Sequence, residues 1–290
     1  MLWQLLSVIF PIFAIVLLGF LYGRRHTPDM ASANKLNIDI FVPALIFDVL
    51  TAKSFNLIEY QSLAIAAVCV VLGSSLIAWP VARLFGFQNK TFIPPMMFNN
   101  SGNLGLPLLV FAFGEQALAA AVVLFIVENT LHFSLGMKIM DSSASLLAIS
   151  RIPILIATVG GLAVSMLDLQ IPQLLATPIN MLGQICIPLM LFALGVRLIN
   201  IDWQDWKIGL AGALTSPLSG LAIAIPVGYL LNLSTQQFSL LVVFGSLPPA
   251  VLNYMIAERF NQQPKQVASI VLLGNLAALA VIPLVLAFVL

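Results

Sequence analysis

Ten stretches of about 20 mostly apolar residues follow one another along this 290-residue chain, and they leave few folds open to it. A helix of about 20 residues crosses the roughly 30 Å hydrocarbon core of a bilayer. Charged residues make up 8% of the chain, against roughly 25% in soluble proteins. The sequence therefore predicts an all-α polytopic membrane protein with ten transmembrane helices. The predicted spans are 3–23, 35–52, 60–84, 91–113, 117–138, 151–168, 174–197, 207–231, 236–257 and 266–289.

Positive charge is divided very unevenly between the two faces that ten spans create. The face that holds both termini carries only Lys53, and the other face carries the remaining eleven of the twelve Lys and Arg residues. Cytoplasmic connectors of membrane proteins are enriched in Lys and Arg. Both termini are therefore predicted on the non-cytoplasmic side of a bacterial inner (plasma) membrane.

The second half of the chain repeats features of the first half at a nearly constant spacing. Phe98 and Phe244 are 146 positions apart, as are Asn129 and Asn275. A unit of five spans crosses the membrane an odd number of times, so two copies insert in opposite orientations. We therefore predict two inverted five-helix repeats, residues 1–140 and 141–290.

Polar and helix-breaking residues interrupt the fourth and ninth spans, at Asn99–Pro107 and Gly245–Asn253. Non-helical backbone at membrane depth is tolerated only where it lines a cavity or is buried in protein. Paired interruptions in two halves are typical of a transporter binding site, and helix ends favour small polar or anionic groups. The alternative is a pair of proline kinks needed only for packing. The predicted substrate-binding residues are Asn100, Ser101, Asn103, Gly105, Pro107, Pro248, Pro249 and Asn253.

Glu128 is the most unusual charge, because it lies near the middle of the fifth span. Intramembrane carboxylates are costly and usually functional, and His132, four residues later, shares the same helix face. One interpretation is that Glu128 carries a proton with His132, in an ion or proton site that also includes Asn129 and Asn275. The alternatives are a protonated Glu128 that only fixes helix packing, and a sodium site built from Glu128 and backbone carbonyls.

Other residues are less informative. No Lys or Arg lies in the central part of a span, so an anionic substrate is expected to be bound by helix ends and Asn or Ser donors, without a guanidinium group. Asp39 is one turn from Lys35 and is expected to pair with it or to reach the interface. Gly19–Gly23 and Ser216–Gly220 have the small-xxx-small spacing of closely packed helices. The chain has no metal-site or serine-hydrolase motif, so neither an enzyme nor a cofactor is predicted.

The ten spans, the inverted repeat and the two broken spans resemble the auxin efflux carrier family of secondary transporters, whose bacterial members are named malate and malonate permeases. The local matches are Asn100–(x)4–Gly105–Leu106–Pro107–Leu108–Leu109 and Leu247–Pro248. In plant relatives a second proline stands at the ninth-span crossover, where this chain has Asn253. The long cytoplasmic loop of the plant carriers is also missing, since the connector 139–150 is short.

The resemblance implies a fold in two parts and a mode of transport. Spans 1, 2, 6 and 7 would form a scaffold, which often mediates a homodimer, and spans 3–5 and 8–10 would form a transport domain. A small organic anion would bind between the two parts, and an elevator-like movement would expose it alternately on either side. Besides this anion, the expected partners are membrane lipid and a second copy of the chain, and the net charge of +1 favours no nucleic acid.

The predicted function is therefore secondary active transport of a small organic carboxylate, with efflux as the expected direction and proton coupling as one option. One alternative is a sodium-coupled organic anion symporter of the bile acid type. Another is a membrane sensor that binds a ligand without moving it, although the short connectors leave no room for an output domain.

Overall fold

The computed structural model describes residues 2–26, 28–52, 55–56, 58–141, 151–197, 199 and 205–290. These residues are helical apart from short connectors and an isolated β-bridge. The first half contains α1 (Leu2–Arg25), α2 (Met30–Leu36), α3 (Val42–Thr51), α4 (Gln61–Phe85), α5 (Asn89–Met97), α6 (Leu106–Phe113), α7 (Leu118–Leu131) and α8 (Met137–Met140). The second half contains α9 (Pro153–Met166), α10 (Gln173–Arg197), α11 (Trp206–Leu230), α12 (Thr235–Ser246), α13 (Leu252–Arg259) and α14 (Pro264–Val289).

Short helices of other types complete the first half. The 3-10 turn η3 (Glu115–Ala117) leads into α7. Three π-helical turns are η1 (Asn37–Phe41) between α2 and α3, η2 (Ser101–Gly105) before α6, and η4 (His132–Gly136) between α7 and α8. Each π turn accommodates an extra residue in a helix, a feature that is frequent at functional sites.

Local signals in the sequence explain several helix ends. The Asp29 carboxylate accepts a hydrogen bond of 2.5 Å from the Ser32 hydroxyl and one of 3.1 Å from the Ser32 backbone N–H, which caps α2. The same bonds, the hydroxyl bond above all, hold the pKa of Asp29 below its usual value. Ser234 caps α12 in the same way, by accepting from the N–H of Gln237 at 3.3 Å. Helix α4 ends at Phe85 because the next residue, Gly86, adopts the left-handed conformation (φ 71°).

The helix bounds lie close to the predicted spans. Predicted span 60–84 corresponds to α4 and span 207–231 to α11, whereas the fourth and ninth spans are each divided into two shorter helices. Five helical segments among the described residues are long and apolar enough to cross a membrane: Gln61–Phe85, Glu115–Met140, Gln173–Arg197, Trp206–Leu230 and Pro264–Val289. An all-α protein with several membrane-length helices is thus confirmed. Ten crossings and an inverted repeat remain predictions.

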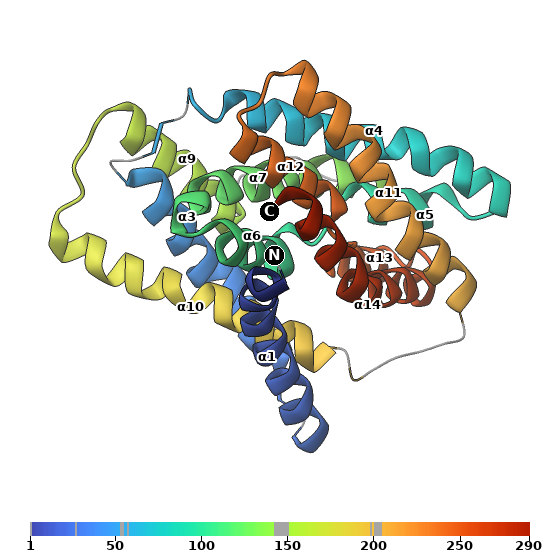
Figure 1. Cartoon of the computed structure of the whole chain (residues 1–290). Coiled ribbons are helices and arrows are strands. Elements are labelled where there is room, and N and C mark those ends of the chain that lie inside the picture. The colour runs from blue at the N-terminus through green and yellow to red at the C-terminus, as the bar shows by residue number, and fades with distance from the viewer. Residues whose placement is uncertain are drawn as a thin grey trace.

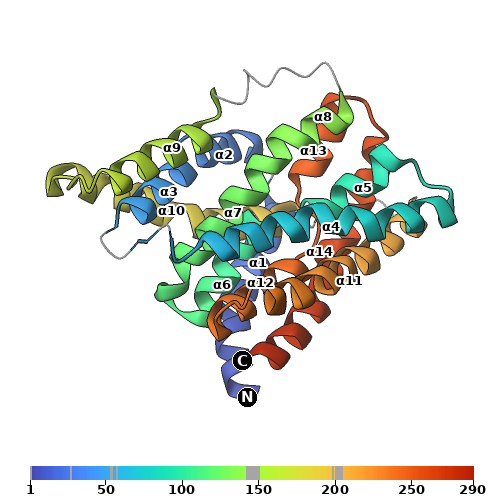
Figure 2. The same ribbon diagram turned by 90° about the horizontal axis from the view of Figure 1, so that it is seen from above.

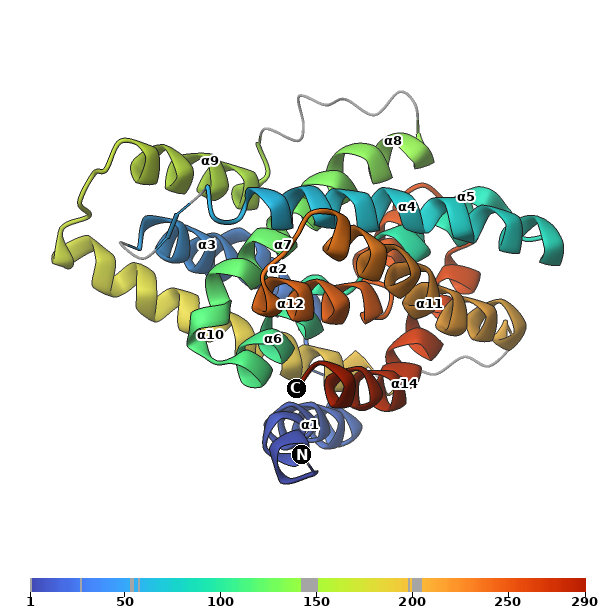
Figure 3. The same ribbon diagram turned by 45° about the horizontal axis from the view of Figure 1, so that its top comes forward.

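The helices pack in two groups (Figure 1). In one group α1 lies along α10, and α3 packs against α9 and α10. In the other group α11 packs against α4, α12 and α14, while α4 also contacts α5 and α7. Figure 2 shows α2, α3, α9 and α10 on one side and α4, α5, α11 and α14 on the other. The start of α1 and the end of α14 lie near each other in every view (Figure 3).

Small residues allow the closest helix contacts. A Cβ atom added at Gly19 would collide with the backbone carbonyl of Phe192 in α10, and one added at Gly195 would collide with that of Val16 in α1. A Cβ atom at Gly220 in α11 would collide with the backbone carbonyl of Gly245 in α12. Close packing at the two small-xxx-small motifs is therefore confirmed.

Replacing Gly220 with Ala is expected to lower the unfolding temperature of the detergent-purified protein, because two backbones would have to move apart. Overpacking of this kind costs about 1–3 kcal/mol. The matched control is Gly160→Ala in α9, where the added Cβ would meet only the Phe47 ring, at an ordinary 3.7 Å. Equal unfolding temperatures for the two variants in a thermal shift assay would show that this contact does not limit stability.

Candidate functional site

The two interrupted segments meet in the interior and pair with each other. The backbone N–H of Asn100 donates to the carbonyl of Pro248 at 2.7 Å, and the N–H of Ala250 donates to the carbonyl of Phe98 at 2.9 Å. Together these contacts form the short antiparallel bridge. Backbone groups at the ends of α5 and α12, which lipid could not satisfy, thereby find partners. The prediction that the breaks cross is confirmed.

The non-helical backbone is shorter than the predicted interruptions. In the first break it covers only residues 98–100, because Ser101–Gly105 is a π turn and Pro107 lies in the first turn of α6. A proline is tolerated in the first turn, where its missing N–H would have no helical partner. In the second break the non-helical residues are 247–251, so Asn253 already belongs to α13.

Two buried asparagine side chains close this crossing from opposite sides. Asn99 donates from Nδ2 to the carbonyl of Phe244 at 2.7 Å. Asn253 donates from Nδ2 to the carbonyls of Phe98 at 2.8 Å and Ala250 at 2.9 Å. The Asn99 amide therefore bonds the last turn of α12, and the Asn253 amide joins the two breaks by bonding Phe98 and Ala250.

Asn129 and Asn275 make the same local hydrogen bond. Each donates from Nδ2 to the carbonyl four residues earlier, that of Phe125 at 3.0 Å and that of Val271 at 2.7 Å. Asn275 also accepts a bond of 2.9 Å from the Nδ2 of Asn100. The two asparagines spaced by 146 positions thus share one local hydrogen bond, and Asn275 is also bonded to the crossing.

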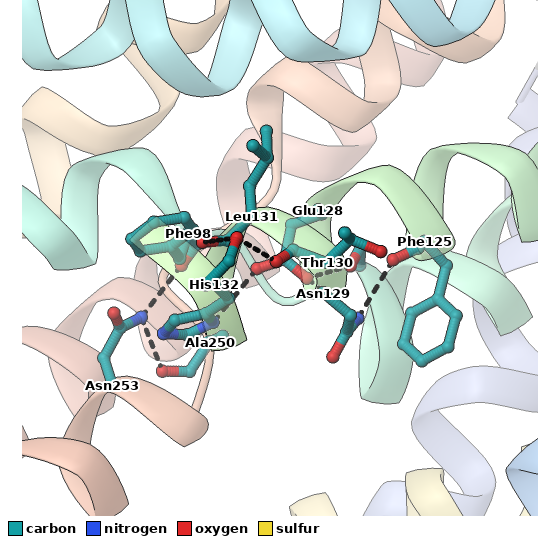
Figure 4. A network of polar contacts seen from close by, with 11 residues as sticks. Phe98, Phe125, Glu128, Asn129, Thr130, Leu131, His132, Ala250 and Asn253 are labelled. Atoms are coloured by element: carbon teal, nitrogen blue, oxygen red, sulfur yellow. Dashed lines mark hydrogen bonds and ion pairs between the residues drawn. The ribbon is translucent and has the colours of Figure 1, made fainter. Parts of the chain in front are cut away.

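A buried polar network is centred on Glu128, whose side chain is 2% exposed (Figure 4). One carboxylate oxygen, Oε2, accepts bonds of 2.9 Å from the hydroxyl of Ser101 and from Nδ2 of Asn129. The other, Oε1, lies 3.2 Å from Nδ1 of His132. The His132 ring stacks on the Phe98 ring, with centroids 4.1 Å apart. The prediction that Glu128 and His132 share a helix face is confirmed, and both residues contact the first break.

A cavity of about 90 Å³ lies beside the crossing and between the two helix groups. Pockets for drug-sized ligands measure roughly 300–1,000 Å³, so this cavity suits a small ligand. Its lining residues are Asn34, Asn37, Ile38, Val42, Asn99, Asn100, Gly102, Asn103, Phe125, Glu128, Asn129, His132, Phe133, Ile154, Met190, Arg197, Ala250, Val251, Leu252 and Met255. Each of the three π turns contributes two neighbouring residues to the lining of the cavity. All three π turns therefore lie at one site.

The sequence matches a family described as "Membrane transport protein" over residues 5–151 and 142–286. The chain belongs to this family of membrane transporters. The transporter is 25% identical over 275 residues to "Uncharacterized transporter YfdV" of Escherichia coli (strain K12), with 87% of each chain covered. It is 22% identical over 307 residues to a "Putative malonate transporter" of Rhizobium meliloti (strain 1021), covering 96% of this chain and 94% of that relative.

A third relative comes from an archaeon. It is an "Uncharacterized transporter" of Methanothermobacter thermautotrophicus, 25% identical over 301 residues, with 96% of each chain covered. The family match confirms the resemblance on which the expected transport activity rests. The chain is accordingly a multi-pass membrane protein of a transporter family, not of an enzyme family.

The predicted site residues of the transporter occupy three kinds of position. Those that line the cavity are Asn100, Asn103, Glu128, Asn129 and His132. Ser101 and Asn275 do not line it, but they hydrogen-bond to Glu128 and Asn100, which do. Those that form or support the crossing without lining the cavity are Gly105, Pro107, Pro248, Pro249 and Asn253.

Most cavity residues of the transporter were not predicted, among them Asn37, Asn99 and Arg197. The side-chain oxygens of Asn37 and Asn99 are buried and have no hydrogen-bond partner among the residues that the structure describes. Arg197, the last residue of α10, also lines the cavity, although the sequence predicted an anion site built from helix ends and Asn or Ser donors. A basic residue at the end of a span ordinarily indicates an interface anchor. Only the path of α10 past the crossing shows that this one lies on the cavity wall.

Charged residues away from the cavity behave as surface groups. Asp39 pairs with Lys35 at 2.6 Å, as expected, on an exposed part of the helix. Among the described residues, no group of three or more His, Cys, Asp or Glu side chains could hold a metal ion. The polar groups of the site are therefore mainly amides, with one carboxylate, one imidazole and one guanidinium group.

Proposed function

We propose that this transporter is a secondary carrier that moves a small organic carboxylate across the bacterial inner membrane, with efflux as the expected direction. The observation that carries the proposal is the small polar cavity at the crossing of two broken helices. Asn103 lies on its wall, and its amide has no hydrogen bond to any residue that the structure describes. It is therefore available to bind a carboxylate oxygen. Both termini are proposed to lie outside the cytoplasm.

Movement of one helix group against the other would give alternating access. One wall of the cavity comes from α2, η1, α3, α9 and α10, and the other comes from η2, α7, η4 and α13. This division supports a scaffold of spans 1, 2, 6 and 7, a transport domain of spans 3–5 and 8–10, and an elevator-like movement. The matching bonds of Asn129 and Asn275 support the inverted repeats 1–140 and 141–290.

The pair of Glu128 and His132 is proposed to couple transport to protons. Without a bound proton the pair carries a charge of −1, with one proton it is neutral, and with two it carries +1. The charged or titratable residues on the cavity wall are this pair and Arg197. Each proton taken up therefore makes the cavity more favourable to an anion, so the two would travel together, and efflux would be driven by an outward gradient of the anion.

Sodium coupling is the second candidate, and a specific observation favours it. The buried side-chain oxygens of Asn37 and Asn99 have no hydrogen-bond partner in the described part of the chain, and amide oxygens can bind hard cations. The cavity of about 90 Å³ is too small for a steroid. Any similarity to bile acid symporters would therefore be limited to the coupling ion. A sensor that binds without transport would show ligand affinity but no flux.

Counterflow of radiolabelled malonate in proteoliposomes tests the proposal. We expect wild-type protein to exchange malonate or another small carboxylate of a panel, with proton and sodium gradients applied separately. Replacing Asn103 with Ala should reduce exchange about tenfold or more, since a hydrogen bond to a charged group contributes about 1.5–3 kcal/mol. The control is Gln236→Ala, an exposed amide on α12. If wild-type protein exchanges no carboxylate of the panel, the proposed function is wrong.

A further inference from the structure

We propose that Arg197 binds the carboxylate of the substrate and is the main source of anion selectivity at this site. The inference rests on the proposed function and adds a residue with a defined role. Arg197 is half-buried at the end of α10 and lines the cavity together with Asn100 and Asn103. It therefore faces the crossing from the opposite helix group.

Packing of α10 against α1 holds Arg197 in this position. Two residues earlier, Gly195 fits so closely against α1 that an added Cβ atom would collide with the carbonyl of Val16 and lie 2.8 Å from the backbone nitrogen of Phe20. Gly23, near the end of α1, has the Val196 side chain 3.1 Å from the position of an added Cβ atom. Contacts of Gly195 and Val196 with α1 thus position the last turn of α10, and Arg197 follows them on the cavity wall.

The charge of Arg197 has no counter-charge within the part of the chain that the structure describes. The ion pairs found there are Lys35 with Asp39 and His132 with Glu128. Since Glu128 is already engaged by Ser101, Asn129 and His132, its carboxylate oxygens are satisfied without Arg197. A half-buried cation without a partner is costly, and a bound anion would offset that cost.

The guanidinium group also has the right shape for the ligand. Its planar arrangement of N–H donors matches the two oxygens of a carboxylate, and such paired bonds are short and strong. The Asn103 amide on the other wall can donate to the same anion or to a second carboxylate. One small ligand would therefore connect the two helix groups, with its charge at Arg197.

Binding of radiolabelled malonate to purified full-length protein, measured by scintillation proximity, tests the role of Arg197. We expect Arg197→Gln to weaken malonate binding about tenfold to a hundredfold, because a charge-assisted bond is lost. Arg259→Gln serves as the matched control, since Arg259 also ends a helix, α13, and is exposed. It should bind malonate as wild type does. Unfolding temperatures measured on the same samples report whether each variant is folded.

Charge discrimination separates binding from a structural role. Wild-type protein should bind malonate more tightly than its neutral analogue malonamide, and Arg197→Gln and Arg197→Met should lose this preference, whatever their overall affinity. A folded variant of either kind that keeps the preference, or that binds malonate within about twofold of wild type, would overturn the inference. Failure of wild-type protein to bind any small carboxylate would instead overturn the proposed function.

Discussion

Replacing Glu128 with Gln is expected to abolish the accumulation of a carboxylate that a pH gradient drives. Glutamine keeps the size of the side chain and one oxygen that can accept from Ser101, but it cannot take up a proton. For one coupled proton, a gradient of one pH unit can drive about tenfold accumulation, and the variant should show none of it. The measurement is malonate accumulation in proteoliposomes with and without an imposed pH gradient.

The matched control for this experiment is Glu115→Gln, which removes an exposed carboxylate at the start of η3. It should respond to the gradient as wild type does. If the Glu128 variant keeps the full response, protons are not carried by this residue. If a sodium gradient alone drives accumulation, the sodium interpretation of the site is correct.

Replacing Asn253 with Ala is expected to reduce both the stability and the transport rate of the protein. The variant loses the side-chain bonds to the carbonyls of Phe98 and Ala250, which are buried where no lipid group can replace them. Each of these carbonyls keeps one backbone donor, so the cost is that of the two lost side-chain bonds, about 0.5–1.5 kcal/mol each. The unfolding temperature of the purified protein should fall by several degrees, and counterflow should fall with it because the crossing shapes the cavity.

The control on the same helix is Tyr254→Phe, which removes only a hydrogen bond between the Tyr254 hydroxyl and the carboxylate of Glu258. Its unfolding temperature should change little. Asn99→Ala should resemble Asn253→Ala, since Asn99 bonds the opposite break through Phe244. Strictly additive effects of the two substitutions would argue that the breaks are not stabilised as one unit.

Hydrophobic length and helix-breaking residues were sufficient to predict most of the fold. The bounds of α4, α10 and α11 follow from apolar runs that end at charged, glycine or polar residues, and these features are local. The two breaks were predictable because Asn, Gly and Pro cluster there in segments that are otherwise apolar. The pairing of Glu128 with His132 was predictable from their spacing of four residues on a helix.

The rest of the site depends on tertiary contacts that no local pattern encodes. Asn253 was predicted to bind substrate, and Asn99 was not predicted as a site residue. The structure shows that both side chains bond the backbone of a segment about 150 residues away. Arg197 was not predicted at the site, because the rotation of α10 about its axis is set by contacts with α1. The π turns at Asn37, Ser101 and His132 have no sequence signature of their own.

The hydrogen bonds across the crossing hold the two broken segments together. There are four such bonds, two donated by the backbone N–H groups of Asn100 and Ala250 and two donated by the side chains of Asn99 and Asn253. Across the cavity, by contrast, the apolar side chain of Met190 faces Gly102, with 3.6 Å between its terminal methyl carbon and the position of an added Cβ atom. This contact contains no hydrogen bond that would have to break if the two sides of the cavity moved past each other. Movement of one helix group against the other, as proposed above, would therefore leave the crossing intact.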